Sequence, residues 1–226
     1  MHKRQADPVT VEVVRNLLMS IAEETNTVII KSAYSTNIKE RRDNTTAIMD
    51  PAGNVVIQVE SSIPMLLAAL LFAARSVVSQ YQPEDIHPGD MFIVNDPYHG
   101  GGNHLPDITV VGPVFSNGKL IGWVGNTAHH SDIGGKVPGS TSGDADSLFQ
   151  EGIRIPVIKI CRDGAVNDDV LKLLLNNTRT PDERMGDLTA QISANLIGTE
   201  KLQAAYEKYG DTLLDCMAEM LDYTNR

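Results

Sequence analysis

One stretch in the middle of the chain constrains the fold more than any other. Residues 107–128 read DITVVGPVF, then SNG, then KLIGWVGNTA, so two runs rich in β-prone residues flank a short turn sequence. This pattern predicts a β-hairpin, and the two outer ends of a hairpin lie side by side. The polar segments that enter and leave it, residues 96–106 and 129–135, should therefore meet at one end of a sheet.

Apolar residues at helical spacing surround this β centre. Asp7 and Pro8 are the residue types of a helix N-cap and first turn, so a long helix should follow them. Three more helices are expected further along, at residues 167–178, 182–209 and 211–223. The fold class predicted is α+β, with antiparallel strands and hairpins, glycine-rich loops, and helices flanking the strands.

Residues 45–58 predict a second hairpin, because two β-prone runs surround the turn sequence DPAGN. Ser61 or Ser62 is expected to cap a helix that ends near Tyr81. The apolar run at 63–74 has 12 residues, whereas a membrane span needs about 20. This run should therefore be a buried helix of a globular protein.

Charge and cysteine content exclude several classes of function. The chain has 226 residues and a formal net charge of −10, and a polyanion such as nucleic acid or an acidic membrane would repel it. Its two cysteines lie far apart, so they form neither a disulfide framework nor a thiolate metal cage. A reducing, cytoplasmic location is expected.

Histidines concentrate in the two loops at the ends of the predicted hairpin. Four of the six, His99, His104, His129 and His130, lie there. If His104, Asp107 and His129 converge, they offer two imidazole nitrogens and one carboxylate oxygen and leave coordination positions open. This donor set suits Mn, Fe, Zn or Co better than Ca or Mg. A metal held so would polarise a carbonyl or lower the pKa of bound water, which predicts glycine-rich metal loops.

The same residue types also have a structural explanation. Aspartates in glycine-rich loops often form turns by accepting hydrogen bonds from nearby backbone amides, and Asp96 and Asp132 fit that description. His99 and His130 could support the ligands or face solvent. The segment GGKV at 134–137 does not predict a nucleotide site, because the upstream glycine spacing of a phosphate-binding loop is missing and valine stands where serine or threonine is needed.

Several segments in order resemble the hydantoinase B/oxoprolinase family, which includes metal-bearing subunits of acetone and acetophenone carboxylases and ATP-dependent lactamases. The segments are IKERRDNTTAIMDPAGNVV, VNDPYHGGGNHLPDITVVGPVF, NTAHHSDIGG, FQEGIRIP and NTRTPDERMGDLTAQISAN, and they span essentially the whole chain. Members of this family are typically much longer, so residues 1–226 are expected to be the N-terminal part, a single domain, of a hydantoinase B-type catalytic subunit.

The resemblance implies a divalent metal, Mn, Zn, Fe or Co, bound by His104, Asp107 and His129. It makes Asp43, in the segment KERRD, a plausible fourth ligand. Asp43 is also a candidate catalytic residue.

His130 and Asp132 are the other two candidate catalytic residues. Arg41 and Arg42 are candidates for binding a phosphate or carboxylate, although a surface ion pair is the commoner role of such arginines.

The activity implied is that of an ATP-dependent cyclic amidase, which opens the ring of a hydantoin, 5-oxoproline or a lactam. A hydantoinase A-like partner would bind the ATP, so this chain would work in a hetero-oligomer on a small cyclic amide. Two alternatives remain. The chain could belong to an ATP-dependent ketone carboxylase of the acetone or acetophenone type, or it could be a truncated, non-catalytic assembly module.

Overall fold

The computed structural model describes residues 7–61 and 63–224, and it has the α+β architecture expected from the sequence. Within these residues, seven antiparallel strands form one sheet in the order β2-β1-β5-β4-β3-β6-β7. The strands are β1 (Asn44–Met49), β2 (Val55–Gln58), β3 (Met91–Val94), β4 (Asp107–Ser116), β5 (Lys119–His129), β6 (Ile158–Arg162) and β7 (Ala165–Val166).

The two predicted hairpins are confirmed. β4 and β5 form the long central one, and Asp107 at the start of β4 lies opposite His129 at the end of β5. β1 and β2 form the other, and β1 also pairs with β5. The end of the sheet where the polar loops meet is therefore fixed by the register of its two longest strands.

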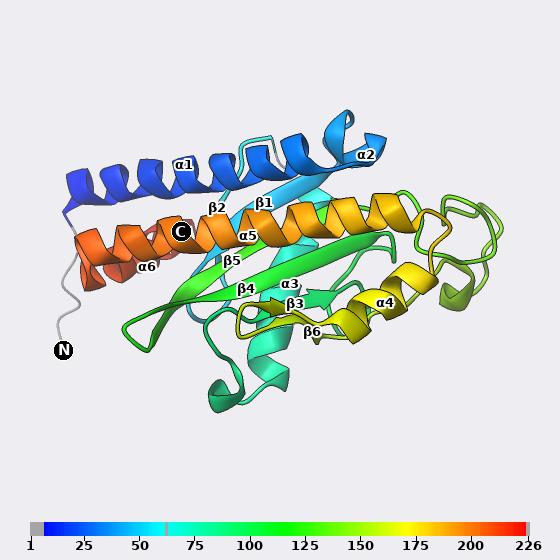
Figure 1. Cartoon of the computed structure of the whole chain (residues 1–226). Helices are drawn as coiled ribbons and strands as arrows, with labels where there is room; N and C mark the ends of the chain where they lie inside the picture. The colour runs from blue at the N-terminus through cyan, green and yellow to red at the C-terminus, as the bar shows by residue number, and fades with distance from the viewer. Residues whose placement is uncertain (1–6, 62, 225–226) are drawn as a thin grey trace.

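Helices cover both faces of the sheet (Figure 1). Three lie together on one face, and α3 crosses the opposite face. Apart from two short 3-10 turns, the helices in the described residues are α1 (Pro8–Ser32), α2 (Thr36–Lys39), α3 (Pro64–Gln80), α4 (Asp168–Asn176), α5 (Pro181–Tyr209) and α6 (Asp211–Thr224). The long helices thus begin and end close to the predicted residues, whereas the short helix α2 was not predicted.

Of the two helix caps predicted, the one at the start of α1 is confirmed and the one at the start of α3 is not. The Asp7 side chain accepts a hydrogen bond from the backbone N–H of Thr10 and caps α1, as expected. The serine cap predicted for α3 is wrong for Ser61, because the N-cap residue is Ile63 and no side chain caps it. Ser62, the other candidate, lies outside the described residues.

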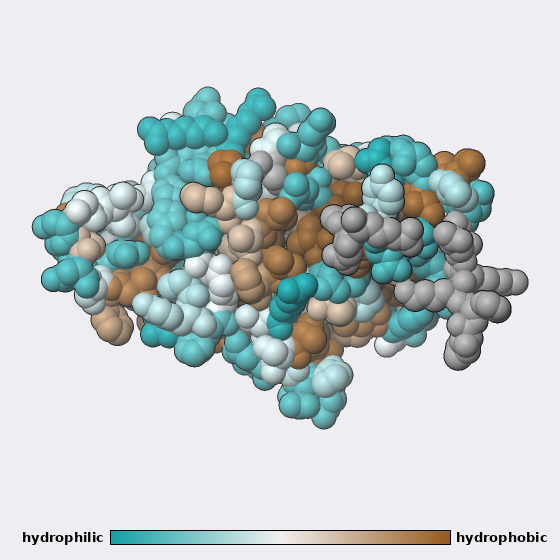
Figure 2. Space-filling view, turned by 180° about the vertical axis from the view of Figure 1, so that it is seen from behind, coloured by the Kyte–Doolittle hydropathy of each residue, from teal (hydrophilic) through white to brown (hydrophobic). Residues whose placement is uncertain are grey.

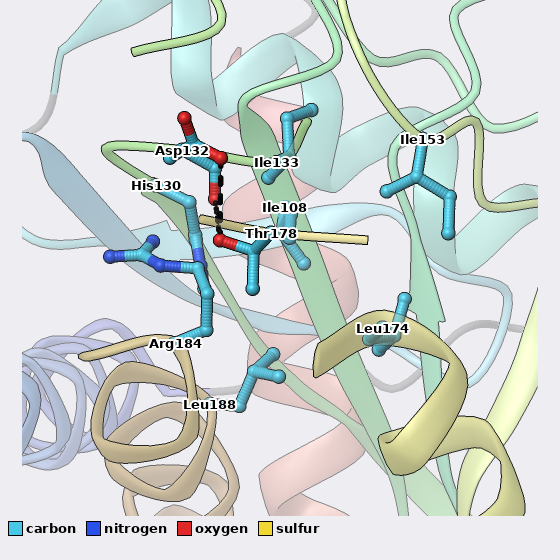
Figure 3. Close-up of a pocket in the computed structure, with 9 residues that line it drawn as sticks. All are labelled: Ile108, His130, Asp132, Ile133, Ile153, Leu174, Thr178, Arg184 and Leu188. Carbon is cyan, nitrogen blue, oxygen red and sulfur yellow. Dashed lines mark hydrogen bonds between the residues drawn. The ribbon is translucent and has the colours of Figure 1, made fainter. Parts of the chain in front are cut away.

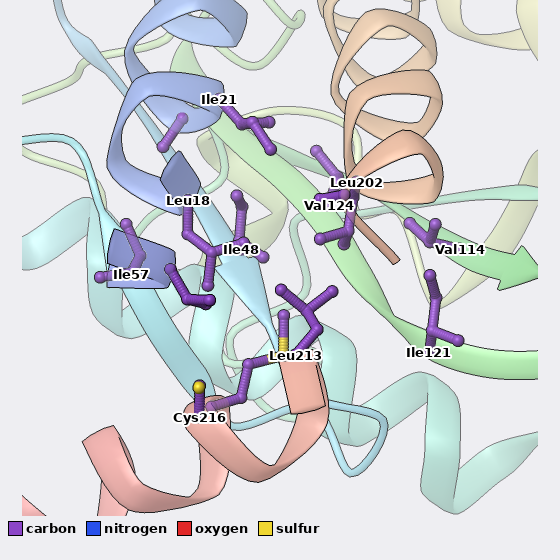
Figure 4. Close-up of a cluster of buried hydrophobic side chains, with 14 of the residues drawn as sticks. Leu18, Ile21, Ile48, Ile57, Val114, Ile121, Val124, Leu202, Leu213 and Cys216 are labelled. Carbon is purple, nitrogen blue, oxygen red and sulfur yellow. The ribbon is translucent and has the colours of Figure 1, made fainter. Parts of the chain in front are cut away.

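Apolar clusters on both faces of the sheet hold the layers together. Figure 4 shows one, in which Leu18 of α1, Leu202 of α5 and Leu213 of α6 pack against strand residues such as Ile48. On the other face, Leu70 of α3 packs in a cluster with Phe92, Trp123 and further strand residues. The functional loops therefore extend from a sheet that is buried on both faces.

The prediction that residues 63–74 form a buried helix is correct for only one face of α3. Leu66, Ala69 and Leu70 are buried against the sheet, but Met65 and Phe72 are 62% and 50% exposed. Hydrophobic side chains are accordingly visible in the middle of the molecule when it is seen from behind (Figure 2). Among the described residues, no helix is both long and apolar enough to cross a bilayer.

Candidate metal centre

The loop between β3 and β4 runs along α3 towards the centre. Near its start, the His99 carbonyl accepts a hydrogen bond from Nε2 of Gln80, at the end of α3. Near its finish, Asn103 donates to the carbonyl of Met65, in the first turn of α3. Between them, Gly101 packs so closely that an added Cβ would lie 1.9 Å from Cβ of Phe72. The glycines therefore let the backbone lie flat against the helix and carry His104 to the helix start.

Buried polar side chains fix both ends of this loop. Asn95, which is 1% exposed, donates to the carbonyls of Leu105 and Ile153 at 2.7 and 2.9 Å. The Asp96 carboxylate accepts from the backbone N–H of Tyr98 and pairs with Arg154 at 2.8 Å. Burial raises the pKa of Asp96, but the Arg154 and Tyr98 hydrogen bonds outweigh it and keep that pKa below its ordinary value. Asp96 is thus a turn residue, one of the alternatives considered.

Three predicted ligands converge where the two loops meet. His104 Nε2 lies 2.8 Å from Asp107 Oδ1, and His129 Nδ1 lies 3.0 Å from the same oxygen. The two ring nitrogens are 3.3 Å apart, and the rings stack with centroids 5.0 Å apart. Asp107 is almost fully buried, while the His104 side chain is 38% exposed, so the group opens towards solvent on the His104 side.

The hydrogen bonds between the histidines and Asp107 favour a protonated His104 and an ionised Asp107. The hydrogen bond with Asp107 raises the pKa of His104 above its ordinary value, against the effect of burial, and the negative charges of Glu151 and Asp43 add to the rise. Burial raises the pKa of Asp107, but hydrogen bonds from His104 and His129 outweigh it, so this pKa is lowered. The second oxygen of Asp107, Oδ2, is buried without a partner.

The arrangement fits a transition-metal ion. Metal bonds of about 2.0–2.2 Å place neighbouring ligand atoms about 2.8–3.1 Å apart in octahedral geometry and about 3.3–3.6 Å apart in tetrahedral geometry. The three atoms of His104, Asp107 and His129 are separated by 2.8 to 3.3 Å. An orphaned carboxylate oxygen among two imidazoles is also what a cation would satisfy, because an unpaired buried polar atom is otherwise costly.

Asp43 is joined to this centre through its backbone, but its carboxylate and the neighbouring Arg41 and Arg42 are outside the ligand group. The backbone N–H of His129 donates to the Asp43 carbonyl at 2.9 Å. The half-buried Asp43 carboxylate is not among the three side chains that converge. Arg41 and Arg42 are exposed, and within the described residues neither forms an ion pair, so the commoner structural role expected for them is not observed. Glu151 also acts on His104 through its charge, and no sequence motif identifies it.

His129 and His130 point to opposite faces of the sheet, because successive strand side chains alternate. His130 is completely buried, and its Nε2 lies 2.9 Å from Oε1 of Gln191 on α5. Burial and the neighbouring Arg184 guanidinium hold the pKa of His130 well below its ordinary value. The alternative that it faces solvent is wrong, and its ring is not among the three side chains that converge.

Asp132 uses both carboxylate oxygens within its own loop region. It accepts hydrogen bonds from the backbone N–H groups of Gly134, Gly139 and Arg179, each at 3.0 Å, and pairs with the Arg179 guanidinium at 3.0 Å. Burial raises the pKa of Asp132, but these hydrogen bonds outweigh it and lower the pKa. The turn-forming alternative explains these contacts, and a catalytic role for Asp132 stays a prediction.

A second histidine–aspartate group, His87, Asp90 and Asp163, has less suitable electrostatics. The Asp90 carboxylate lies 2.7 Å from the buried Lys159 ammonium. His87 and Asp163 are exposed and 3.7 Å apart. Because the lysine already neutralises the buried carboxylate, a cation would gain little there.

Comparison with known proteins gives a consistent picture. The family model described as hydantoinase B/oxoprolinase matches residues 7–226. An uncharacterized protein of Methanocaldococcus jannaschii is 40% identical over 96% of this chain and 39% of its own length. The crystal structure of ATP-dependent caprolactamase from Pseudomonas jessenii is similar over 96% of this chain and 37% of that chain, with 33% identity and a TM-score of 0.88.

A structure of acetone carboxylase shares the fold as well. Its TM-score is 0.88 over 96% of this chain and 28% of that chain, at 21% identity. The present chain thus spans less than two fifths of the length of each of these proteins.

Proposed function

Because this chain belongs to the hydantoinase B/oxoprolinase family, we propose that it is the metal-bearing part of an ATP-dependent cyclic amidase. The substrate class is a small cyclic amide, such as a hydantoin, 5-oxoproline or a lactam, whose ring is opened by hydrolysis. The observation that carries this proposal is the convergence of His104, Asp107 and His129 at one end of the sheet. Caprolactamase, a relative of similar fold and 33% identity, supports the choice of a lactam-type substrate.

His104, Asp107 and His129 would hold a divalent Mn, Zn, Fe or Co ion. When bound, such an ion supplies Lewis acidity towards an amide carbonyl or lowers the pKa of water. Asp107 anchors the group from its buried side, and its single negative charge is shared by both imidazoles. The carboxylates of Asp43 and Glu151 add negative charge next to His104 and favour a cation there.

Arg41 and Arg42 are proposed to bind the anionic group that ATP chemistry places on the substrate. Both guanidinium groups are exposed, and an arginine fork binds phosphate or carboxylate oxygens in pairs. The ATP itself would be bound by a hydantoinase A-like partner subunit in the cytoplasm. The chain would then correspond to the N-terminal part of the family's catalytic subunit, as expected from the sequence.

Metal analysis of the purified chain tests the core of this proposal. After dialysis against a weak chelator, the wild-type chain should retain close to one equivalent of Mn, Fe, Co or Zn. His104→Ala and His129→Ala should lose it. His87→Ala is the matched control, because it removes a histidine from the second His–Asp group and should leave the metal content unchanged. Equal metal in the wild type and in all three variants would contradict the assignment.

Activity assays with the partner subunit then separate the reaction classes. ATP-dependent opening of a lactam or hydantoin, lost in His104→Ala, supports the amidase. Substrate consumption that requires bicarbonate would instead indicate the ketone carboxylase, whose fold is shared but whose identity is lower. Partner activity that is equal with wild type and with the metal-free variants would favour an assembly module.

A further inference from the structure

Three buried amide side chains form a ladder between α5 and the central hairpin. Asn195 donates to the Val110 carbonyl at 3.0 Å, and Gln191 donates to the Ile108 carbonyl at 2.9 Å. Asn126 donates to the Gln191 carbonyl at 3.0 Å and to Oδ1 of Asn195 at 2.8 Å, and it accepts from Nε2 of Gln191 at 2.8 Å. Because backbone carbonyls only accept, each amide has one possible orientation.

This ladder fixes the tautomer of His130. With its amide nitrogen directed at Ile108 and Asn126, Gln191 turns its oxygen to Nε2 of His130, at 2.9 Å. An amide oxygen only accepts, so Nε2 carries the hydrogen. In the neutral ring Nδ1 is then an acceptor, and it is buried without a partner.

His130 also lines a small cavity. It is lined by Ile108, His130, Asp132, Ile133, Ile153, Leu174, Thr178, Arg184 and Leu188 (Figure 3). In this view His130, Thr178 and Arg184 lie on the left, the isoleucines and Leu174 lie towards the right, and Leu188 lies below. Nε and Nη1 of Arg184, which is 3% exposed, have no hydrogen-bond partner, although its Nη2 binds Asp187, Glu183 and Ser131. Such orphaned groups are rare in native proteins.

We propose that this cavity holds one water molecule, which donates to Nδ1 of His130 and accepts from the guanidinium of Arg184. The volume within the cavity that the centre of a water-sized sphere can occupy is about 10 Å³. This is close to the smallest space that holds one water molecule. A chloride ion has no hydrogen to donate to Nδ1, a protonated oxyanion such as hydrogenphosphate is too large for this space, and a metal cation would be repelled by Arg184. Water is the ligand that both donates and accepts at this size.

The water gives His130 a positioning role that does not depend on the proposed activity. It joins the residue after β5 to the first turns of α5, across the face opposite the candidate metal centre. His130 directly follows His129, whose backbone N–H is held by Asp43. The water therefore helps to fix where β5 ends and its loop begins.

A crystal structure that resolves ordered waters, together with NMR of the wild-type chain, tests the proposal. We expect one density peak within hydrogen-bond distance of His130 Nδ1 and of Arg184. A proton–nitrogen correlation spectrum should report the hydrogen on Nε2 of His130, and a long-lived water should show an Overhauser effect to the His130 ring. An empty cavity, or a hydrogen on Nδ1, would overturn the proposal.

Arg184→Lys provides the variant test, since it keeps a cation near Asp187 but removes the N–H groups that the water accepts from. We expect loss of the water peak with the Nε2 tautomer of His130 and the metal content unchanged. Arg179→Lys is the matched control, because Arg179 binds the same loop but does not line the cavity, and it should keep the peak. A water peak unchanged in Arg184→Lys would exclude Arg184 as its partner. If Arg184→Lys fails to fold, the wild-type measurements decide.

Discussion

Gly101→Ala should separate the loop that carries His104 from α3. Gly101 has φ +76, and an alanine Cβ at this position would lie 1.9 Å from Cβ of Phe72. The Phe72 ring can rotate away, but its Cβ is fixed by the helix backbone. The loop must therefore move, and His104 is only three residues further along the chain.

The magnitude has two parts that a control can separate. A left-handed backbone costs a non-glycine residue about 1–2 kcal/mol, and overpacking costs about 1–3 kcal/mol, so Gly101→Ala should lower the free energy of unfolding by about 2–5 kcal/mol. Gly118, in the β4–β5 turn, has the same φ of +76 and nothing within 4 Å of an added Cβ. Gly118→Ala should therefore cost only the backbone part. The difference between the variants, about 1–3 kcal/mol, measures the contact with Phe72.

Urea unfolding followed by tryptophan fluorescence gives these energies, because Trp123 is the single tryptophan and is fully buried. Metal content measured on the same samples shows whether His104 has moved, with loss expected in Gly101→Ala and retention in Gly118→Ala. If both variants lost equal stability and both kept their metal, the loop would not be packed on α3 as described, and the reasoning would be refuted.

Two further predictions concern buried titratable groups. Burial raises the pKa of Cys161 to about 11, and Cys216 is buried too. Both thiols should therefore react with iodoacetamide far more slowly in the native chain at pH 8 than in urea. Rapid labelling of the native chain would contradict this prediction. Asp132 has a folded pKa below its ordinary 3.8, so its contribution to stability should be complete above that pH and be lost as the pH falls through the folded pKa. Acid titration of unfolding should accordingly be less steep in Asp132→Asn than in the wild type; equal slopes would count against the prediction.

The convergence of the three candidate ligands was predictable from local pattern. A hairpin places its ends together, and the turn sequence SNG set the register that pairs Asp107 with His129. Strand alternation also implies that His129 and His130 point to opposite faces of the sheet. In the same way, Gln191 and Asn195, four residues apart on one helix, marked a polar stripe facing the sheet.

Other features depend on contacts between distant segments, which local patterns do not contain. Asp132 binds Arg179, 47 residues away in the sequence, and this contact supports its turn-forming role. The apolar sequence of α3 predicts burial but not that only one of its faces meets the sheet. Whether Asp43 joins the ligands likewise depends on the direction of its side chain. That direction is set by the backbone, which is left-handed at the preceding residue, Arg42, with φ 55.

The register of the central hairpin has a consequence at its far end. From Ser116 to Asp107 the strand covers about 30 Å at about 3.3 Å per residue, yet the turn at Asn117 and Gly118 decides which of two adjacent histidines faces Asp107. A slip of one residue would exchange the two faces, burying His129 beneath α5 and presenting His130 to the ligands. The β4–β5 turn thus controls, from the far end of the hairpin, which histidine faces Asp107. Along the hairpin, the pairing shifts by one residue only at the bulge between Val114 and Phe115.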